Sequence, residues 1–540
     1  MSAVRMLFLV ILVAMALPAQ QAKWQLSGPF NHHYRLLAPF SDYNGDGIRD
    51  VLFQVTPNSP LSNVIEVRIL SGDDGSILWQ LPLDVNNVAS VGDMDGDGSP
   101  DLVVQRPYAI GPVWPIPAKN AIQVWSPKRN QMLWQVFGNF NANFGYAMLG
   151  DLDTDGDGFP NLVTLSWSGP ESDVYVYNNR GLLQYKLPMA AFNREAISLA
   201  GMGDMDGDGC DDFIIGISEP TARGEVRLIS GRTGATLRSS YGIAPGELTF
   251  QFATNVGDLD GDGVNDYAAF PWWSAFQLRI VIWSGATGAV LRTFADYAES
   301  VIACEDLDLD GVNDLVLGSE YWVQPNVYGR TIALSGRDGT ELWRIENFLG
   351  SWQPSSGWGR FAASLGVQPG SPYPVVSWLD IMYKNLTLPL GGAQGRVRAF
   401  GGAYAGQGPV VGTPCSSTSH VPQIGTRNTA TGSRITIAKA EPGAFAWLNL
   451  MVGNPASYGG VLLPVSLDTI GFPGCMLHVA PEISFLRMLG TTGIDRGYAA
   501  VDLNWHLAAA QGYELQAQWL TFDPPSLAYS ATARHAIQLQ

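Results

Sequence analysis

One nine-residue motif occurs six times in this chain, with Asp or Asn at positions 1, 3, 5 and 9 and glycine at position 6. Successive copies begin 48 to 60 residues apart. That spacing is typical of four-stranded propeller blades and is too long for a solenoid that adds one strand per coil. Because each repeat can bury its apolar face only against its neighbours, the motif constrains the whole fold. The copies are Asp42–Asp50, Asp93–Asp101, Asp153–Asn161, Asp204–Asp212, Asp258–Asp266 and Asp306–Asp314.

The segments around the loops favour β-structure. Short apolar runs such as Val51–Phe53 and Leu315–Leu317 follow the loops, which is typical of buried strands. Further along most units, a phrase with Ser-Gly and a later Gly indicates a hairpin, whose last glycine supplies a positive φ. The composition, with 46% hydrophobic and 15% charged residues, 61 Gly and 34 Pro, fits an all-β protein with many turns. The hairpin phrases are Ile69–Trp79, Val226–Leu237, Ile282–Leu291 and Ala333–Trp343.

A seventh unit lacks the acidic loop. Residues Trp358–Gly366 resemble Phe144–Gly150, which leads into the third loop. A Val-Gln-Pro-Gly-Ser-Pro segment that begins at Val367 follows in place of the aspartates. We therefore expect a β-propeller of seven blades with six metal sites.

The N-terminal phrase Trp24–Leu26 matches a strand phrase of another blade, Trp79–Leu81. The match predicts that this segment is a displaced blade strand. We expect it to pair with Gly395–Phe400 and to close the ring, which removes two open sheet edges.

The motif predicts calcium sites. Side-chain oxygens at positions 1, 3, 5 and 9, with the backbone carbonyl of position 7, can surround a hard cation at about 2.3–2.6 Å. Glycine at position 6 permits the backbone reversal that turns this carbonyl inward. No His or Cys side chain recurs at a ligand position, which disfavours zinc. We expect about six structural Ca²⁺ ions, held by Asp42, Asn44, Asp46, Ile48, Asp50, Asp93, Asp95, Asp97, Ser99, Asp101, Asp153, Asp155, Asp157, Phe159, Asn161, Asp204, Asp206, Asp208, Cys210, Asp212, Asp258, Asp260, Asp262, Val264, Asp266, Asp306, Asp308, Asp310, Val312 and Asp314.

An EF-hand is the alternative interpretation of the first half of the loop. That motif needs a bidentate Glu at position 12 and an exiting helix. The chain instead continues into short apolar runs, so the loops lead into a sheet. Position 12 is occupied by Phe53, Val104, Thr164, Ile215, Ala269 and Leu317.

These units resemble the FG-GAP (VCBS-type) repeats of integrin α-subunit propellers and of related secreted bacterial proteins. The resemblance rests on the six Asp loops and on lead-ins such as Phe144–Asp151 and Phe252–Asp258, and it covers about residues 24–402. It implies a seven-bladed propeller with calcium in the blade loops. The departures are Asn44, Asn161 and the seventh unit. Because Asn keeps an oxygen ligand but lacks the charge, we expect the first and third sites to be weaker.

The chain divides into three parts. Residues 1–22 carry an apolar run from Met6 to Leu17 and then small residues, which is typical of a secretory signal peptide and too short to span a bilayer. Residues 23–402 are the predicted propeller. In residues 403–540 the acidic repeats stop, and β-rich segments predict a small C-terminal β-sandwich domain. These segments are Arg434–Ala438, Cys475–Val479, Tyr513–Trp519 and His535–Leu539.

Four cysteines in an exported chain allow three complete pairings. Cys415 and Cys475 share the C-terminal domain and sit in similar Gly/Pro turns, so we predict that they form a disulfide. Cys210 and Cys304 lie two blades apart and are expected to be free.

The net charge of −18 arises mostly in the loops, whose predicted ligand positions hold 22 of the 49 acidic residues. Since bound calcium would offset much of it, the charge does not favour a nucleic-acid partner. We find no catalytic constellation in the sequence, so an enzyme is the less favoured class. We expect a secreted scaffold, without a transmembrane segment in the mature chain, that binds extracellular or cell-surface protein or polysaccharide. The alternatives are a secreted carbohydrate-active lyase or hydrolase on a propeller, and a purely structural surface component.

Overall fold

The computed structural model describes the chain between residues 22 and 538, with internal gaps. Apart from two single 3-10 turns, η3 (Asp468–Ile470) and η4 (Gly493–Asp495), the regular elements of this part are all β-strands. Within it, no helix has the length and apolar character that a bilayer crossing needs. The described residues are 22–27, 32–57, 66–83, 85–109, 118–139, 143–167, 173–189, 195–218, 224–242, 252–270, 280–294, 300–323, 326–351, 362–367, 374–383, 393–401, 407–429, 432–453, 457–458, 461–504 and 514–538.

Seven four-stranded antiparallel sheets make up most of the described chain. In six of them, four consecutive strands pair in sequence order. These six are β2 (His32–Phe40), β3 (Asp50–Pro57), β4 (Glu66–Leu70), β5 (Ile77–Pro82); β6 (Asn87–Gly92), β7 (Asp101–Ala109), β8 (Ala118–Ser126), β9 (Gln131–Phe137); β10 (Asn143–Leu152), β11 (Asn161–Trp167), β12 (Asp173–Tyr177), β13 (Leu183–Pro188); β14 (Glu195–Gly203), β15 (Asp212–Ser218), β16 (Glu225–Ile229), β17 (Thr236–Tyr241); β18 (Phe252–Gly257), β19 (Asp266–Phe270), β20 (Ile280–Trp283), β21 (Val290–Phe294); and β22 (Ser300–Cys304), β23 (Asp314–Val323), β24 (Asn326–Leu334), β25 (Glu341–Ser351). The seventh has the order β1 (Ala22–Ser27), β28 (Ala393–Gly401), β27 (Pro374–Tyr383), β26 (Ala362–Val367).

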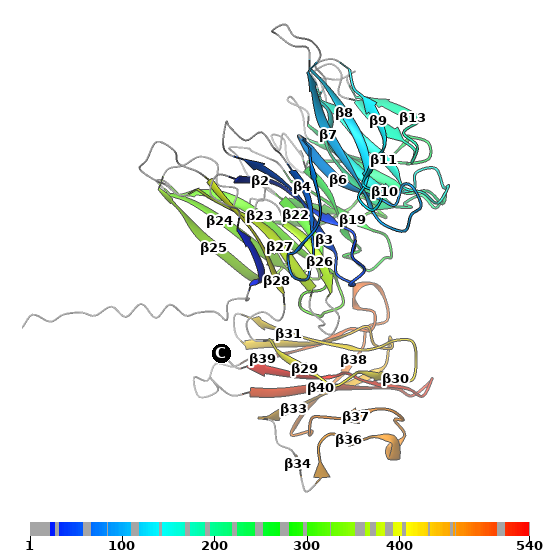
Figure 1. Cartoon of the computed structure of the whole chain (residues 1–540). Helices are drawn as coiled ribbons and strands as arrows, with labels where there is room; N and C mark the ends of the chain where they lie inside the picture. Colours follow the sequence, from blue (N-terminus) through cyan, green and yellow to red (C-terminus); the bar gives the residue numbers. More distant parts are fainter. Residues whose placement is uncertain are drawn as a thin grey trace, which may run out of the picture.

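The sheets are arranged as a ring of blades. The first strand of each blade contacts the first strand of the next, in the series β2, β6, β10, β14, β18, β22 and β26, and β26 contacts β2 again. This closed series makes the larger part of the chain a seven-bladed β-propeller, which is drawn in blue to yellow-green in Figure 1. The predicted fold class is confirmed. The segment that replaces the acidic loop in the seventh blade, residues 368–373, lies outside the described residues.

Apolar side chains hold neighbouring blades together. Between the third and fourth blades, Val163 and Val174 form one buried cluster with Phe213 and Ile215, all with no exposed surface. These residues lie in the short apolar runs that follow the acidic loops, and in the strands paired with them. Full burial of such a side chain stabilises the fold by about 1.5–3 kcal/mol, so apolar clusters of this kind hold neighbouring blades together.

The N-terminal strand completes the last blade. β1 pairs antiparallel with β28, with Trp24 opposite Ala399 and Leu26 opposite Val397. The predicted ring closure is therefore confirmed. A blade assembled from both ends of the propeller sequence joins the first and last repeats, which leaves neither repeat at an open end.

The C-terminal part is a sandwich of two antiparallel sheets below the propeller in Figure 1. Ile435 and Ile437 of one sheet share a buried core with Leu448 and Trp519 of the other, as predicted for a β-sandwich. The expected strand Cys475–Val479 is shorter, because only Met476–Leu477 pairs. One sheet contains β29 (Gln407–Val411), β42 (Arg534–Gln538), β40 (Glu514–Asp523), β33 (Phe445–Val452) and β38 (Ile483–Met488), with β30 (Cys415–Ser416) and β41 (Ala528–Ala531); the other contains β31 (Gln423–Thr429), β32 (Gly432–Ala438) and β39 (Ala499–Asn504); two short pairs are β34 (Ser457–Tyr458) with β35 (Val461–Leu462) and β36 (Val465–Ser466) with β37 (Met476–Leu477).

The cysteines are arranged as predicted. Cys415 and Cys475 form a disulfide, with their Cα atoms 5.4 Å apart. Cys210 and Cys304 are free and buried. The disulfide connects β30 to the turn before β37 and so ties together parts of the C-terminal domain that are 60 residues apart in sequence.

Candidate metal-binding loops

Each acidic loop occupies the same place in its blade, between the first strand and the second. The residue at loop position 9 is the first residue of the second strand in all six blades. All six of these residues are fully buried. They are Asp50, Asp101, Asn161, Asp212, Asp266 and Asp314.

Backbone amides organise the loop around the aspartate at position 1. In the fifth loop, Asp258 Oδ1 accepts the N–H groups of Gly261 at 2.7 Å and Asp262 at 3.2 Å, and its Oδ2 accepts the N–H of Gly263 at 2.8 Å. Gly261 and Gly263 have φ values of 76° and 88°, in the region that only glycine adopts without strain. Hydrogen bonds within the loop thus shape the turn and hold the Asp258 carboxylate in place.

A second set of glycines, which the sequence analysis did not identify, connects the loop to the outer hairpin through hydrogen bonds from their backbone N–H groups. Asp266 Oδ2 accepts the N–H of Leu259 at 2.8 Å, and Oδ1 accepts the N–H of Gly285 at 2.9 Å. A Cβ on Gly285 would lie 1.8 Å from the carbonyl oxygen of Asn265, so no larger residue fits. The Ser-Gly pair that recurs in the hairpin phrases is the sequence signal from which this hydrogen bond to the position 9 carboxylate could have been predicted. The same contact is made by Gly72, Gly231 and Gly336 with Asp50, Asp212 and Asp314.

The loops bring carboxylate oxygens together in five of the six cases. In each of these loops, one oxygen from each of three aspartates lies within 4.8 Å of the others. The first loop, where Asn44 takes position 3, forms no such group of three acids among the described residues. Positions 1, 3 and 9 make the group in the second, fourth and sixth loops, and positions 1, 3 and 5 in the third and fifth. The groups are Asp93, Asp95, Asp101; Asp153, Asp155, Asp157; Asp204, Asp206, Asp212; Asp258, Asp260, Asp262; and Asp306, Asp308, Asp314.

The electrostatics of these groups favour a cation. Burial, with repulsion from neighbouring aspartates, raises the pKa of Asp101 to about 7 and the pKa values of Asp50 and Asp266 to about 6. Asp101 Oδ1 is buried without a hydrogen-bond partner. In the second blade Pro127 stands where four other blades have the N–H of glycine, so Asp101 accepts a backbone N–H at Oδ2, from Met94 at 2.9 Å, but none at Oδ1. Oxygen donors with unsatisfied negative charge fit a hard divalent cation such as calcium.

Basic residues from the hairpins lie at the rim of three loops. Arg129 Nη1 is 3.0 Å from Asp95 Oδ2, Arg232 Nε is 3.3 Å from Asp208 Oδ2, and the Nε atom of Arg337 is 3.3 Å from an oxygen of Asp310. These guanidiniums offset part of the acidic charge from outside the group. The position 7 residues place their N–H groups on the position 5 carboxylate, as Val264 does on Asp262 at 2.9 Å, and the role of their carbonyls as ligands stays a prediction.

The third loop departs from the pattern at position 9. Asn161 Oδ1 accepts both the N–H and the hydroxyl of Thr154, at 2.6 and 2.9 Å, while its Nδ2 is buried without a partner. Asp157 completes the group of three acids in this loop instead. A weaker affinity of the third site for calcium therefore stays a prediction, because Asn161 at the buried position 9 carries no negative charge.

Together, the fold and its repeated acidic loops define a β-propeller protein whose blade loops gather carboxylates that could hold a metal ion. No protein-family model matches the chain. The chain is similar to integrin alpha-V of Gallus gallus, at 24% identity over 171 residues, which are 28% of this chain and 16% of that protein. The match thus spans about a sixth of the integrin's length. Among solved structures, a chain described as the Dos1 propeller aligns with a TM-score of 0.36 and 8% identity, over 70% of this chain and 97% of that chain.

Proposed function

We propose that this protein is a secreted, calcium-binding β-propeller that serves as a scaffold for binding an extracellular or cell-surface protein or polysaccharide. The observation that carries the metal assignment is the grouping of three aspartate oxygens within 4.8 Å in five blade loops. Such groups repel one another when ionised, and a bound cation removes that repulsion. We assign about six ions a structural role, with the thirty loop positions named from the sequence as ligands.

The binding role rests on three supports. The propeller is a rigid ring whose connecting loops can vary without loss of the fold. The apolar N-terminal run over residues 1–22 and the disulfide between Cys415 and Cys475 agree with an oxidising, extracellular location. The partial similarity to an integrin α-subunit favours a protein partner. We assign the propeller to residues 23–402 and the sandwich to residues 403–540.

Two measurements on the protein without residues 1–22 test this proposal. Equilibrium dialysis against calcium in excess of the expected dissociation constants should show about six calcium ions bound per chain, and protein kept in chelator should hold none. A panel of immobilised extracellular proteins and polysaccharides should retain the calcium-loaded protein on one class of ligand. Absence of bound calcium would contradict the metal assignment, and new reducing or unsaturated sugar ends would favour the carbohydrate-active alternative over a binding scaffold.

A further inference from the structure

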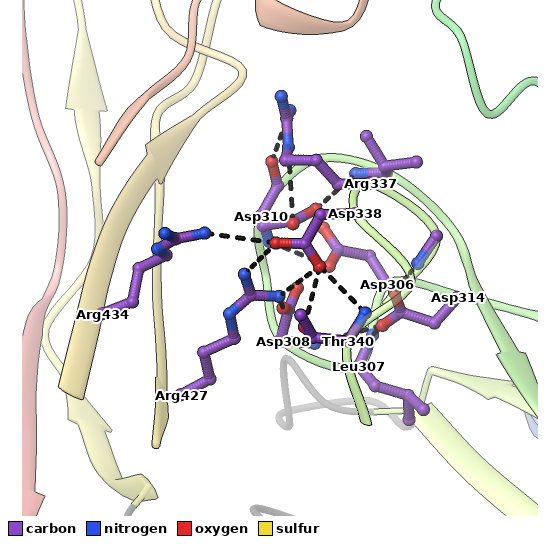
Figure 2. A network of polar contacts seen from close by, with 12 residues as sticks. Asp306, Leu307, Asp308, Asp310, Asp314, Arg337, Asp338, Thr340, Arg427 and Arg434 are labelled. Atoms are coloured by element: carbon purple, nitrogen blue, oxygen red, sulfur yellow. Dashed lines mark hydrogen bonds and ion pairs between the residues drawn. The ribbon is translucent and has the colours of Figure 1, made fainter. Parts of the chain in front are cut away.

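The sixth loop differs from the loop two blades earlier because the C-terminal domain covers it. Asp308 and Asp310 are 2% and 1% exposed, whereas Asp206, which matches Asp308 in the fourth loop, is exposed. Figure 2 shows the sixth loop with arginine side chains directed toward it, including Arg427 and Arg434 from the neighbouring strands β31 and β32. A loop that would otherwise face solvent is therefore part of an interface between the two domains.

Arg427 links the domains through a predicted metal ligand. Its Nη1 donates to Asp308 Oδ2 at 3.2 Å, and the guanidinium also pairs with Asp338 on the hairpin of the same blade. Arg427 is 6% exposed, so this contact is largely removed from water. Arg434 reaches the same Asp338 carboxylate at 3.2 Å. Removal of one partner from a buried ion pair leaves the other charge uncompensated, which strongly destabilises the contact.

The backbones of the two domains also pack closely at this loop. A Cβ on Gly425 of β31 would lie 2.2 Å from the carbonyl oxygen of Asp308, and a Cβ on Gly311 would lie 2.8 Å from Cβ of Ala438. Position 4 of this loop is Leu309, with φ 57° and 1% exposure, where the other five loops have glycine. The backbone of the sixth loop therefore packs directly against β31 and β32. A small shift of the loop backbone would displace these strands of the C-terminal domain.

A second contact lies beside the first. Ile494 of η4 packs against the apolar cluster shared by the fifth and sixth blades. Arg337, whose guanidinium contacts Asp310, also pairs with Asp495 at 2.9 Å and lies 3.5 Å from the ring centroid of Tyr498. The C-terminal domain is thus attached around the sixth loop by both apolar and charged groups.

The charges at the sixth loop leave room for one divalent cation. Four buried carboxylates, at positions 1, 3, 5 and 9, are contacted by two guanidiniums, those of Arg337 and Arg427. Arg427 and Arg337 also pair with Asp338 and Asp495, so the acidic charge around this loop exceeds the charge of its guanidiniums, which favours a cation. Asp308 Oδ1 is buried and has no hydrogen-bond partner, although Oδ2 of the same carboxylate accepts from Arg427. The Asp308 carboxylate belongs to the group formed with Asp306 and Asp314.

We propose that the sixth loop is an interdomain metal site, in which one divalent cation on Asp306, Asp308 and Asp314 locks the C-terminal domain onto the propeller. The inference rests on the proposed calcium binding. Asp308 bridges the two partners, because one oxygen faces the cation and the other accepts from Arg427. Since binding free energies are reciprocal, the cation strengthens docking of the domain, and the docked domain strengthens cation binding at this loop. The loops that face solvent lack this coupling.

The test compares Asp308→Asn with Asp206→Asn, the same change at position 3 of the fourth loop. In calcium titrations, both variants of the full mature chain should bind one calcium ion more weakly than the unaltered protein, because Asn keeps an oxygen ligand but lacks the charge. Only Asp308→Asn should release the C-terminal domain, seen as an increased radius of gyration in small-angle X-ray scattering and as a separate, lower melting transition. Arg427→Gln, which leaves the loop intact, should release the domain in the same way and weaken one calcium site about tenfold.

The outcomes separate this inference from the proposed function. Chelation that removes the ions and shifts the propeller transition, but leaves the domain docked, would overturn the interdomain site while calcium binding stands. Equal calcium affinity of every site in Asp308→Asn and the unaltered protein would also overturn it, because Arg427 would then stand in for a cation. A chain that binds no calcium would overturn both proposals.

Discussion

The carboxylate of Asp266, at the end of the fifth loop, accepts the backbone N–H of Gly285 at 2.9 Å, across 19 residues of sequence. This bond fastens the outer hairpin of the blade to the loop that is predicted to hold a cation. The same carboxylate also accepts the N–H of Leu259 at 2.8 Å, so it closes the loop from both sides. Loop shape and blade packing therefore depend on each other.

We expect Gly285→Ala to destabilise the propeller. Its Cβ would lie 1.8 Å from the carbonyl oxygen of Asn265, so the hairpin must move away and the bond to Asp266 must lengthen. Overpacking of this kind costs about 1–3 kcal/mol, and the lost hydrogen bond about 1 kcal/mol more. Denaturant titration of calcium-free protein measures the change. Ala286→Ser, at the exposed next residue, is the control and should stay within about 0.5 kcal/mol of the unaltered protein.

Removal of calcium should lower the melting temperature of the propeller. Sites of extracellular modules have dissociation constants of about 10⁻⁴ to 10⁻³ M, so a tenfold excess of calcium stabilises each by about 1.4 kcal/mol. Six such sites would contribute about 8 kcal/mol, comparable to the net stability of a domain. Calorimetry with and without chelator measures this shift, and a transition that does not move would refute a structural role.

A paired variant localises that effect to one loop. Asp260→Ala with Asp262→Ala removes two of the three acids grouped in the fifth loop. It should remove one ion and part of the calcium-dependent shift in melting temperature. Alanine at Gln368 and Gly370, in the segment that replaces the acidic loop of the seventh blade, should leave the ion count unchanged.

The calcium-free propeller should become less stable as pH rises from about 4 to about 7. The pKa values of Asp101, about 7, and of Asp50 and Asp266, about 6, lie above the value of 3.8 for an unperturbed Asp. These groups bind protons more tightly in the folded state, so their contribution is complete below pH 3.8 and is lost as pH passes the folded pKa values.

Melting temperatures of metal-free protein across this pH range test the prediction. Asp101→Asn cannot titrate at this position, so it should flatten the dependence between about pH 5 and pH 7. Excess calcium should also flatten or reverse it, because protons and cations compete for the same carboxylates. A dependence that is identical in the variant and the unaltered metal-free protein would contradict the assignment.

Deletion of residues 23–30 should destabilise the whole ring, because β1 is the fourth strand of the last blade. Five residue pairs join β1 to β28, and without them β28 becomes an open edge. We expect a lower melting temperature and increased aggregation. A synthetic peptide of residues 22–30 added in excess should restore part of the lost stability, and a scrambled peptide should not. Unchanged melting after the deletion would show that β1 does not close the ring.

The sequence by itself determined the blades, the loops and the ring closure. Each depends on a local pattern that recurs: the acidic spacing with Gly263 and its counterparts, the apolar strand after each loop, and the Trp24–Leu26 phrase that repeats a strand of another blade. The disulfide was also predictable, since Cys415 and Cys475 share the C-terminal domain and sit in similar turns, whereas Cys210 and Cys304 lie two blades apart. The blades and loops are predictable because their residues are close in sequence, whereas the ring closure follows from a repeated strand phrase and the disulfide from a shared domain.

The tertiary structure alone decided that the sixth loop lies at an interface. From the sequence, its aspartates belong to one of six equivalent loops, and the two domains are independent units. Asp308 and Arg427 are 119 residues apart, and their contact arises only because the sandwich docks on one particular part of the ring. Likewise, the close approach of Gly285 to Asn265 depends on how the third and fourth strands fold back over the second. No local pattern encodes these distances, because docking and packing bring together segments whose spacing along the chain does not repeat.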